Sequence, residues 1–136
     1  MRTKWENLLL IFSAIVFLDR IFKVYLKDSC VSVFCIRRAA NEGAAFGIFP
    51  GKLWLFILIS LIVIALIIYF WKIKRIRLAL AFMAAGTAGN LIDRIVYGKI
   101  MDVFSIFNSS SFNLADISNI AGATLLIIFI LKSEKK

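Results

Sequence analysis

The feature that most restricts the fold of this chain is a long segment without a charged residue, from residue 53 to residue 71. Ser60 is its one small polar residue, and leucine, isoleucine and aromatic residues make up most of the rest. An α-helix needs about 20 consecutive apolar residues to cross the hydrocarbon layer of a membrane. The segment therefore predicts a transmembrane helix.

Three further apolar segments have a similar length. They cover about residues 5–26, 78–97 and 113–131, and hydrophobic residues make up 62% of the whole chain. That share lies well above the share in soluble domains. A chain of 136 residues is also short for a second domain. We therefore expect a single-domain (1–136), all-α membrane protein with four transmembrane helices.

The basic residues are distributed unevenly among the connections. Nine lie at the two termini and in the turn 72–77, whereas four lie in the connection 27–52 and one, Lys99, in the connection 98–112. Cytoplasmic segments of membrane proteins carry the excess of Lys and Arg, so both termini are expected in the cytoplasm. Within the first outer connection, residues 31–36 are mostly β-branched or aromatic and predict a short strand.

Composition excludes several classes of function. The formal net charge is +9, but the basic residues form short clusters at the ends of apolar segments, so we expect no nucleic-acid binding. The chain has no histidine, which excludes histidine-containing triads and histidine-rich zinc sites; we expect no metal and no cofactor. Cys30 and Cys35 are the only cysteines and do not form a CxxC motif. An outward-facing disulfide and a pair of free thiols both fit.

Several polar residues interrupt the predicted transmembrane helices, where such groups are costly. Asp19 and Lys23 are four residues apart and can pair on one helix face. They fit either a cluster that snorkels to the membrane surface or a buried aspartate that braces a site. Gly86, Asn90 and Asp93 share one face of the third helix, which fits either helix packing or a functional site.

Two aspartates, Asp102 and Asp116, are expected on the outer side of the membrane, 14 residues apart. Asp116 also follows Asn113 by three residues, so it can instead cap the fourth helix. Two carboxyls that share a site do not both ionise readily, so one holds a proton. The ionised carboxylate can then take a proton from attacking water while the protonated carboxyl polarises an amide carbonyl. This chemistry permits amide hydrolysis without a metal, a histidine or a covalent intermediate.

An alternative function is a small proton-coupled carrier or channel subunit, with Asp19 and Asp93 as relay groups. It predicts carboxylates at successive depths of the membrane. The four candidates Asp19, Asp93, Asp102 and Asp116 all lie in the predicted outer half, and the segment 53–71 contains none. A non-catalytic assembly or lysis protein, in contrast, would tolerate neutral replacements of these carboxylates. Hydrolysis is the function that the pattern favours.

Five motifs together resemble those of the lipoprotein signal peptidases (signal peptidase II) of bacteria. They are Asp19 in the first helix, Asn41-Glu-Gly-Ala-Ala-Phe-Gly47, Gly86-Thr-Ala-Gly-Asn-Leu-Ile-Asp-Arg94, Asp102-Val-Phe104 and Phe112-Asn-Leu-Ala-Asp116. Each motif alone is modest. In this order and within four apolar segments they are highly specific, and the resemblance covers essentially the whole chain.

The resemblance implies an aspartyl endopeptidase of the bacterial cytoplasmic membrane. Such enzymes remove the signal peptide from prolipoproteins, cutting just before a cysteine that carries a diacylglyceryl group. Asp102 and Asp116 match the catalytic pair of the family. The positions that support this pair or line the substrate groove match Asp19, Asn41, Gly86, Asn90, Arg94, Asn113 and Ala115.

The family fold further implies a small extracytoplasmic β-cradle, built in the first outer connection, and an active site near the outer face of the membrane. The stretch 41–46 is expected to close over the site, and Arg94 is expected to pair with a carboxylate. The expected partners are lipid-modified prolipoproteins and membrane lipids. Nothing in the sequence requires more than one chain, so we expect a monomer.

Overall fold

The computed structural model describes residues 4–43, 51–107 and 110–134, which include four long α-helices. They are α1 (Trp5–Tyr25), α2 (Leu53–Phe70), α3 (Arg77–Tyr97) and α4 (Leu114–Glu134). Their bounds lie within a few residues of the expected ranges. A short 3₁₀ turn, η2 (Lys74–Ile76), connects α2 to α3.

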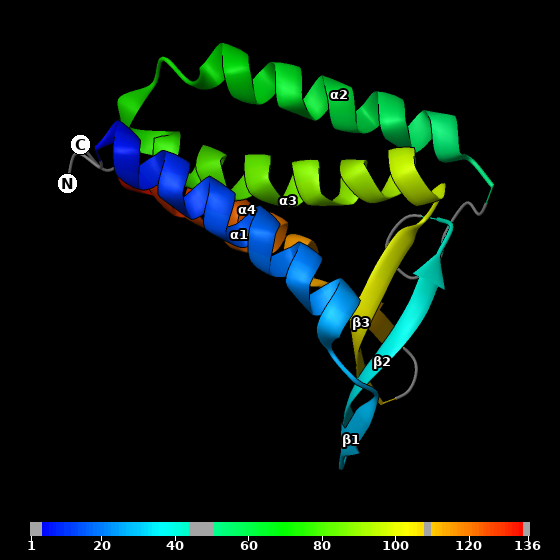
Figure 1. Cartoon of the computed structure of the whole chain (residues 1–136). Coiled ribbons are helices and arrows are strands. Elements are labelled where there is room, and N and C mark those ends of the chain that lie inside the picture. Colours follow the sequence, from blue (N-terminus) through cyan, green and yellow to red (C-terminus); the bar gives the residue numbers. More distant parts are fainter. Residues whose placement is uncertain (1–3, 44–50, 108–109, 135–136) are drawn as a thin grey trace.

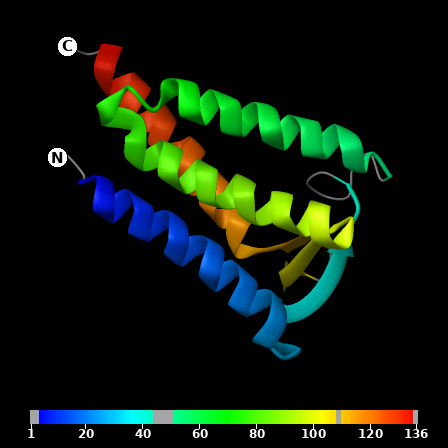
Figure 2. The same ribbon diagram turned by 45° about the horizontal axis from the view of Figure 1, so that its top comes forward.

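Helix α3 is the centre of the bundle. It packs against α4, α1 and α2, and the start of α1 and the end of α4 lie at the same end of the molecule (Figures 1 and 2). Small residues allow the closest contact. A Cβ atom placed on Gly122 of α4 would lie 2.8 Å from the carbonyl oxygen of Ala79 on α3. Close approach of two helices through small residues is typical of helices that pack within membranes.

A four-stranded antiparallel sheet lies at the other end of the bundle (Figure 1). Its strands are paired in the order β1 (Ser29–Val31), β2 (Phe34–Asn41), β3 (Ile100–Ile106) and β4 (Ser110–Phe112). The strand expected at residues 31–36 is therefore present, although a turn at Ser32, with a φ of 56°, divides it into two. Strands β3 and β4 were not expected from the sequence: β3 pairs with β2, about 65 residues away in the sequence, and β4 completes the sheet by pairing with β3.

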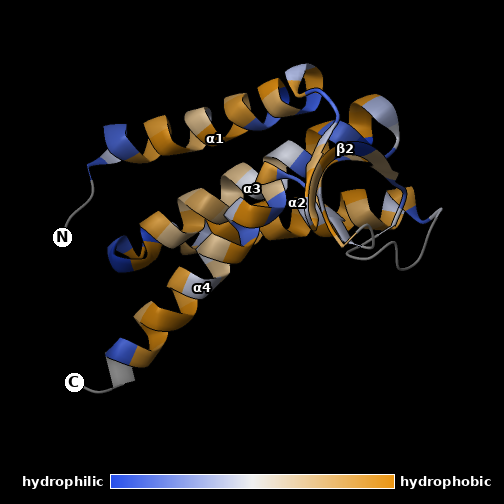
Figure 3. Ribbon diagram, turned by 90° about the horizontal axis from the view of Figure 1, so that it is seen from below, coloured by the Kyte–Doolittle hydropathy of each residue, from blue (hydrophilic) through white to orange (hydrophobic). Residues whose placement is uncertain are grey.

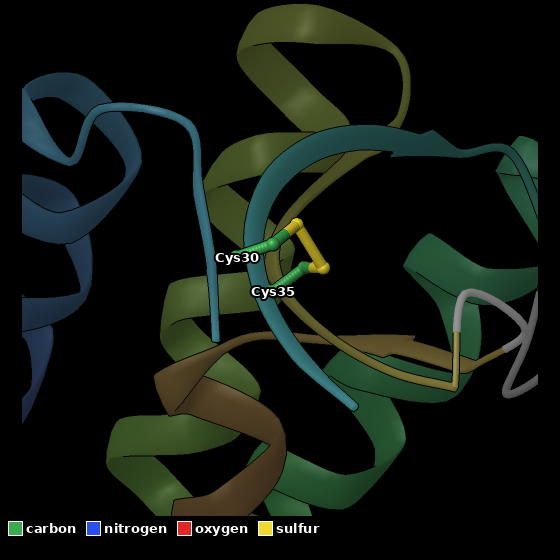
Figure 4. The surroundings of a disulfide bond; sticks show 2 residues. All are labelled: Cys30 and Cys35. Carbon is green, nitrogen blue, oxygen red and sulfur yellow. A yellow bond between two sulfur atoms is a disulfide. The ribbon is translucent and has the colours of Figure 1, made fainter. Parts of the chain in front are cut away.

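A disulfide joins Cys30 on β1 to Cys35 on β2 (Figure 4). The two residues are direct partners in the antiparallel register, with their Cα atoms 4.1 Å apart. Of the two alternatives that the sequence permits, the structure therefore contains the disulfide. It closes the outermost hairpin of the sheet.

The apolar side chains of the helices are largely on the outside. Helix α2 consists mostly of hydrophobic residues (Figure 3). Trp54 and Ile68 of this helix are 79% and 68% exposed. Two segments, Leu53–Phe70 and Leu114–Lys132, are long and apolar enough to cross a membrane. Helices α1 and α3 have similar lengths, but several of their charged residues, including Asp19, Lys23 and Asp93, are buried. This inverse arrangement, with apolar residues outside and charges inside, fits a lipid surrounding.

Replacement of Gly122 by valine should destabilise the bundle. The added Cβ would lie 2.5 Å from Cγ of Met83 and 2.8 Å from backbone atoms of α3, so the helices would have to separate. Such overpacking costs about 1–3 kcal/mol. Thermal unfolding of the detergent-solubilised protein, followed by tryptophan fluorescence, should show a lower melting temperature. Ala123→Val adds similar bulk at the exposed neighbouring position and should have little effect; equal losses in the two variants would contradict the packing argument.

Candidate active site

The two candidate catalytic aspartates come from different elements at the sheet end of the bundle. Asp102 lies in the middle of β3, and Asp116 lies in the first turn of α4. Asn90 reaches them from the last part of α3, and Asn41 from the end of β2. Four segments that are separate in the sequence therefore meet at one place.

Asparagine side chains connect the two aspartates. Asn113 donates a hydrogen bond from Nδ2 to Oδ1 of Asp102, at 3.0 Å, and another to Oδ1 of Asn90, at 3.1 Å. Asn90 in turn donates from Nδ2 to Oδ1 of Asp116, at 2.7 Å. Asn41 lies 3.5 Å from the second oxygen of Asp102. The two carboxyl groups thus belong to one hydrogen-bonded network with a defined geometry.

Asp116 also caps α4. Its backbone N–H donates to Oδ1 of Asn113, at 2.9 Å, and its Oδ2 accepts the backbone N–H of Asn113, at 3.1 Å. This reciprocal pair is a capping box. The capping role that the sequence allowed as an alternative is therefore real, but it leaves Asp116 at the wall of a cavity. Both carboxylate oxygens of Asp116 accept hydrogen bonds from neutral donors.

Asp102 has a different environment. Its side chain is 1% exposed, and burial raises its pKa to about 6 from an ordinary value of 3.8, with the charge of Asp116 as the second cause. Hydrogen bonds from Asn113 and Asn41 and the charge of Lys23 act in the opposite direction. The two carboxyl groups are therefore not equivalent, and Asp102 is the one that retains a proton more readily.

A cavity of about 430 Å³ opens beside Asp116. Its wall is formed by residues of α3, α4 and the sheet: Asn41, Asn90, Arg94, Ile100, Ser110, Ser111, Phe112, Asp116, Asn119 and Ile120. The polar part of this wall is next to the aspartate network, and the remainder is apolar. A molecule in this cavity would contact Asp116 directly, which makes the cavity a candidate substrate site.

Four charged residues, Asp19, Arg20, Lys23 and Asp93, form a largely buried charge cluster between α1 and α3. Lys23 Nζ lies 2.8 Å from Oδ2 of Asp19 and 2.7 Å from Oδ2 of Asp93. Arg20 forms ion pairs with both aspartates and donates to the carbonyl oxygen of Gly89, at 3.0 Å. The two positive and two negative charges balance, which a buried cluster requires.

The charge cluster holds the backbone next to both candidate catalytic aspartates. Oδ1 of Asp19 accepts the N–H of Ala115, at 3.1 Å, and Oδ2 of Asp93 accepts the N–H of Met101, at 3.1 Å. Ala115 and Met101 are the residues directly before Asp116 and Asp102. One rigid group of side chains therefore sets the positions of the two segments that carry the aspartates. Because Asp19 and Asp93 form ion pairs with Arg20 and Lys23, they do not resemble the unpaired relay carboxylates of a proton pathway.

The structure brings the expected site residues together around the two aspartates at this end of the bundle, except Gly86, which lies in the middle of α3. Gly86 allows α4 to approach, because a Cβ atom there would lie 2.3 Å from the carbonyl oxygen of Ala115. Half of the segment expected to close over the site, residues 44–46, lies outside the described residues.

Arg94 differs from its expectation. Its guanidinium lies over the ring of Phe56, with Cζ 5.1 Å from the ring centre, and it lines the cavity. Within the described part of the chain, the ion pairs of Asp93 go to Arg20 and Lys23 instead. The reason is that Asp93 points into the bundle and is fully buried, whereas Arg94 lies about 100° further around the helix.

Two residues of the site were missed by sequence reasoning. Arg20 follows Asp19 directly, and an arginine inside an apolar segment is itself a signal of a buried pair. Asn119 is a polar residue in the apolar fourth segment and was not singled out. Both residues make contacts with α3, where Arg20 pairs with Asp93 and Asn119 accepts a hydrogen bond from Thr87.

Comparison with solved structures first defines the class of protein. A structure described as a bacterial membrane enzyme at 2.3 Å resolution superimposes with a TM-score of 0.86 and 28% sequence identity, over 99% of this chain and 94% of that one. A second structure with the same kind of description, at 1.9 Å resolution, gives a TM-score of 0.83 at 28% identity, over 97% and 98% of the two chains. The helical bundle with its small sheet is thus the fold of a bacterial membrane enzyme.

Sequence comparison then identifies the family. The profile of signal peptidase (SPase) II matches residues 11–132. The lipoprotein signal peptidase of Syntrophomonas wolfei is 37% identical, over 97% of this chain and 95% of its own length. That of Halothermothrix orenii is 42% identical, over 76% and 74%. The chain belongs to the signal peptidase II family of bacterial membrane proteases, as the five sequence motifs indicated.

The pKa of Asp102 should fall when Asp116 is replaced by asparagine, because the neighbouring negative charge that helps to raise it is removed. Infrared titration of the protonated carboxyl band measures this directly. Asp28→Asn removes an exposed carboxylate and should leave the titration unchanged. An unchanged Asp102 titration in Asp116→Asn would show that the two carboxyls do not interact.

The wild-type pKa of Asp102 also implies a pH dependence of folding stability. The stability contributed by Asp102 is present below about pH 4 and is lost as the pH rises through about 6.

The charge cluster should stabilise the fold only while its charges balance. Lys23→Met leaves two buried carboxylates with Arg20 alone and should cost about 3 kcal/mol or more. Adding Asp93→Asn restores the balance and should recover part of that loss, because the asparagine oxygen can still accept the N–H of Met101. Thermal unfolding of both variants and of each single variant measures the coupling. Losses that simply add in the double variant would contradict a coupled cluster.

Proposed function

We propose that this protein is an aspartyl endopeptidase that removes the signal peptide from diacylglyceryl-modified prolipoproteins, cutting just before the lipidated cysteine. The observation that carries the proposal is the network in which Asn113 and Asn90 link Asp102 to Asp116 at the wall of a cavity. Membership of the signal peptidase II family supports this substrate, since its relatives bear the name lipoprotein signal peptidase.

The different environments of the two aspartates suggest their roles. Asp116 borders the cavity, and its carboxylate takes a proton from a water molecule that attacks the scissile carbonyl. Asp102, whose pKa is raised to about 6, holds the shared proton and hydrogen-bonds the carbonyl oxygen as negative charge develops there. The carbon–nitrogen bond then breaks, and the leaving nitrogen receives the proton taken from water. The sequence of steps requires no metal and no cofactor.

The other site residues support this chemistry. Asn113, Asn90 and Asn41 donate to the aspartates and keep their carboxyl planes in place. Asp19 acts through Ala115, because its carboxylate holds the backbone that precedes Asp116. Arg94 contributes a positive charge to the cavity wall beside Asp116, and Gly86 allows the close contact of α3 and α4.

We further propose that the chain is a single domain (1–136) that crosses the bacterial cytoplasmic membrane four times, with both termini in the cytoplasm. The start of α1 and the end of α4 lie at one end of the bundle, near the basic turn 72–77, and the sheet lies at the opposite end (Figure 1). The disulfide between Cys30 and Cys35 fits a sheet outside the reducing cytoplasm.

This placement puts the candidate site near the outer membrane surface. A substrate anchored by acyl chains stays in the bilayer, so its cleavage site is available only at that depth. The proposed partners are therefore lipid-modified prolipoproteins and the surrounding membrane lipids, and one chain carries every residue that the proposed mechanism uses.

Asp102→Asn and Asp116→Asn should each abolish cleavage of a lipidated precursor, with a loss of at least a hundredfold in rate, because each removes one of the two proton-transfer groups. Purified protein in detergent micelles or liposomes, incubated with a synthetic diacylglyceryl peptide, allows product to be measured by mass spectrometry. Both variants keep a side chain of the same shape. Each replaces one acceptor oxygen by a donor, so both variants are expected to fold with a lower melting temperature than the wild type.

Asp28→Asn is the matched control, because it removes an exposed carboxylate at the same end of the molecule. It should leave cleavage unchanged. Wild-type turnover by either Asp102→Asn or Asp116→Asn would end the assignment of the pair. Loss of activity together with loss of folding would assign the residue to stability instead.

A further inference from the structure

Asn119 is a polar side chain in the part of α4 that is apolar enough to cross a membrane. It lies three residues after Asp116 and lines the same cavity. At a rise of 1.5 Å per residue, it lies about 4.5 Å further along the helix axis, toward the interior of the bundle. A polar group at such a position is costly unless it has partners, so its contacts indicate what it does.

The carbonyl group of the Asn119 side chain already has a partner. Thr87 on α3 donates a hydrogen bond from Oγ1 to Oδ1 of Asn119, at 3.2 Å. This bond turns the amide so that the oxygen faces α3. Among the hydrogen bonds between described residues, none is donated by the other end of the amide, Nδ2. Its two N–H donors are thus available to a molecule in the cavity.

Gly86 keeps this amide in place. A Cβ atom at position 86 would lie 2.7 Å from both Cγ and Oδ1 of Asn119, so only glycine leaves room for the side chain against α3. The Thr87 hydroxyl comes from the next residue of the same turn. Two neighbouring residues of α3 therefore fix the orientation of one side chain of α4, which makes Asn119 a preorganised donor.

The cavity defines what this donor can bind. Asp116, Asn90 and Arg94 line its polar part, and Ile120 contributes to its apolar part. A substrate held for reaction at Asp116 passes Asn119 where it continues into the apolar region. In such a region the strongest available acceptor on a peptide or an acylated glycerol is a carbonyl oxygen.

We propose that Asn119 is a substrate-binding residue whose Nδ2 donates a hydrogen bond to a carbonyl oxygen of the substrate, about one turn of α4 from Asp116. The inference rests on the proposed peptidase function and adds a contact to it. The carbonyl belongs either to the backbone of the signal peptide or to an ester of the diacylglyceryl group. The chemistry of recognition is the same in both cases.

Asn119→Leu removes the donor at similar volume. With a diacylglyceryl precursor peptide, we expect KM to rise about five- to tenfold while kcat stays within about twofold, because one hydrogen bond made equally in the ground state and the transition state affects binding alone. Asn119→Ala removes the donor without adding a branched side chain. It should give the same split between KM and kcat if Asn119→Leu does not fold.

Thr124→Val is the matched control, since it replaces a polar by an apolar side chain at an exposed position of α4. It should change neither constant. A precursor with ether-linked chains, which lacks the ester carbonyls, separates the two sources of the acceptor. If the Asn119 effect persists with this precursor, the acceptor is a peptide carbonyl; if the effect disappears, the acceptor is an ester.

A wild-type KM in the folded Asn119 variants with both precursors would overturn the binding role of Asn119 and leave the peptidase function intact. A change in kcat alone would also overturn it. Failure of the wild-type protein to cleave either precursor would instead overturn the proposed function, and the substrate contact with it.

Discussion

The buried charge cluster of Asp19, Arg20, Lys23 and Asp93 is the interaction on which the arrangement of the site depends. Three of its members are on α1 and one, Asp93, is on α3, and Lys23 contacts both carboxylates. Such a cluster is costly to bury, and its benefit is geometric rather than a large gain in stability. Each of its aspartates also accepts a backbone N–H from the residue before a candidate catalytic aspartate. The cluster therefore connects the packing of α1 on α3 to the spacing of the pair.

Asp102 and Asp116 belong to one hydrogen-bonded network, but their environments differ. Asp102 extends from a strand into a fully buried position, where desolvation favours its neutral form. Asp116 is at a helix N-terminus, where its two carboxylate oxygens accept a side-chain and a backbone N–H. Proton-transfer catalysis by two identical residue types requires this kind of difference. The difference arises from the meeting of a strand with a helix end and not from either element alone.

The helices and most site residues could be predicted from the sequence. Apolar length predicted α1 to α4, and polar residues inside apolar segments drew attention to Asp19, Asn90, Asp93 and Asp116. Strands β3 and β4 and the partners of Asp93 could not be predicted. Strand β3 is stabilised by pairing with β2, and Asp93 by pairing with residues of α1, both distant in the sequence, while β4 pairs with β3. Asn119 was missed for the same reason, because its role depends on Gly86 and Thr87 of the neighbouring helix.

The sequence by itself determined which segments are helical, because hydrophobic length and the spacing of polar groups are local properties. It also determined the family, because the five motifs occur in a fixed order along the chain. Only the tertiary structure decided which charges pair, that Cys30 and Cys35 form a disulfide, and that Asn113 and Asn90 join the two aspartates. Those contacts depend on the relative positions of separate elements, which packing of the whole chain sets.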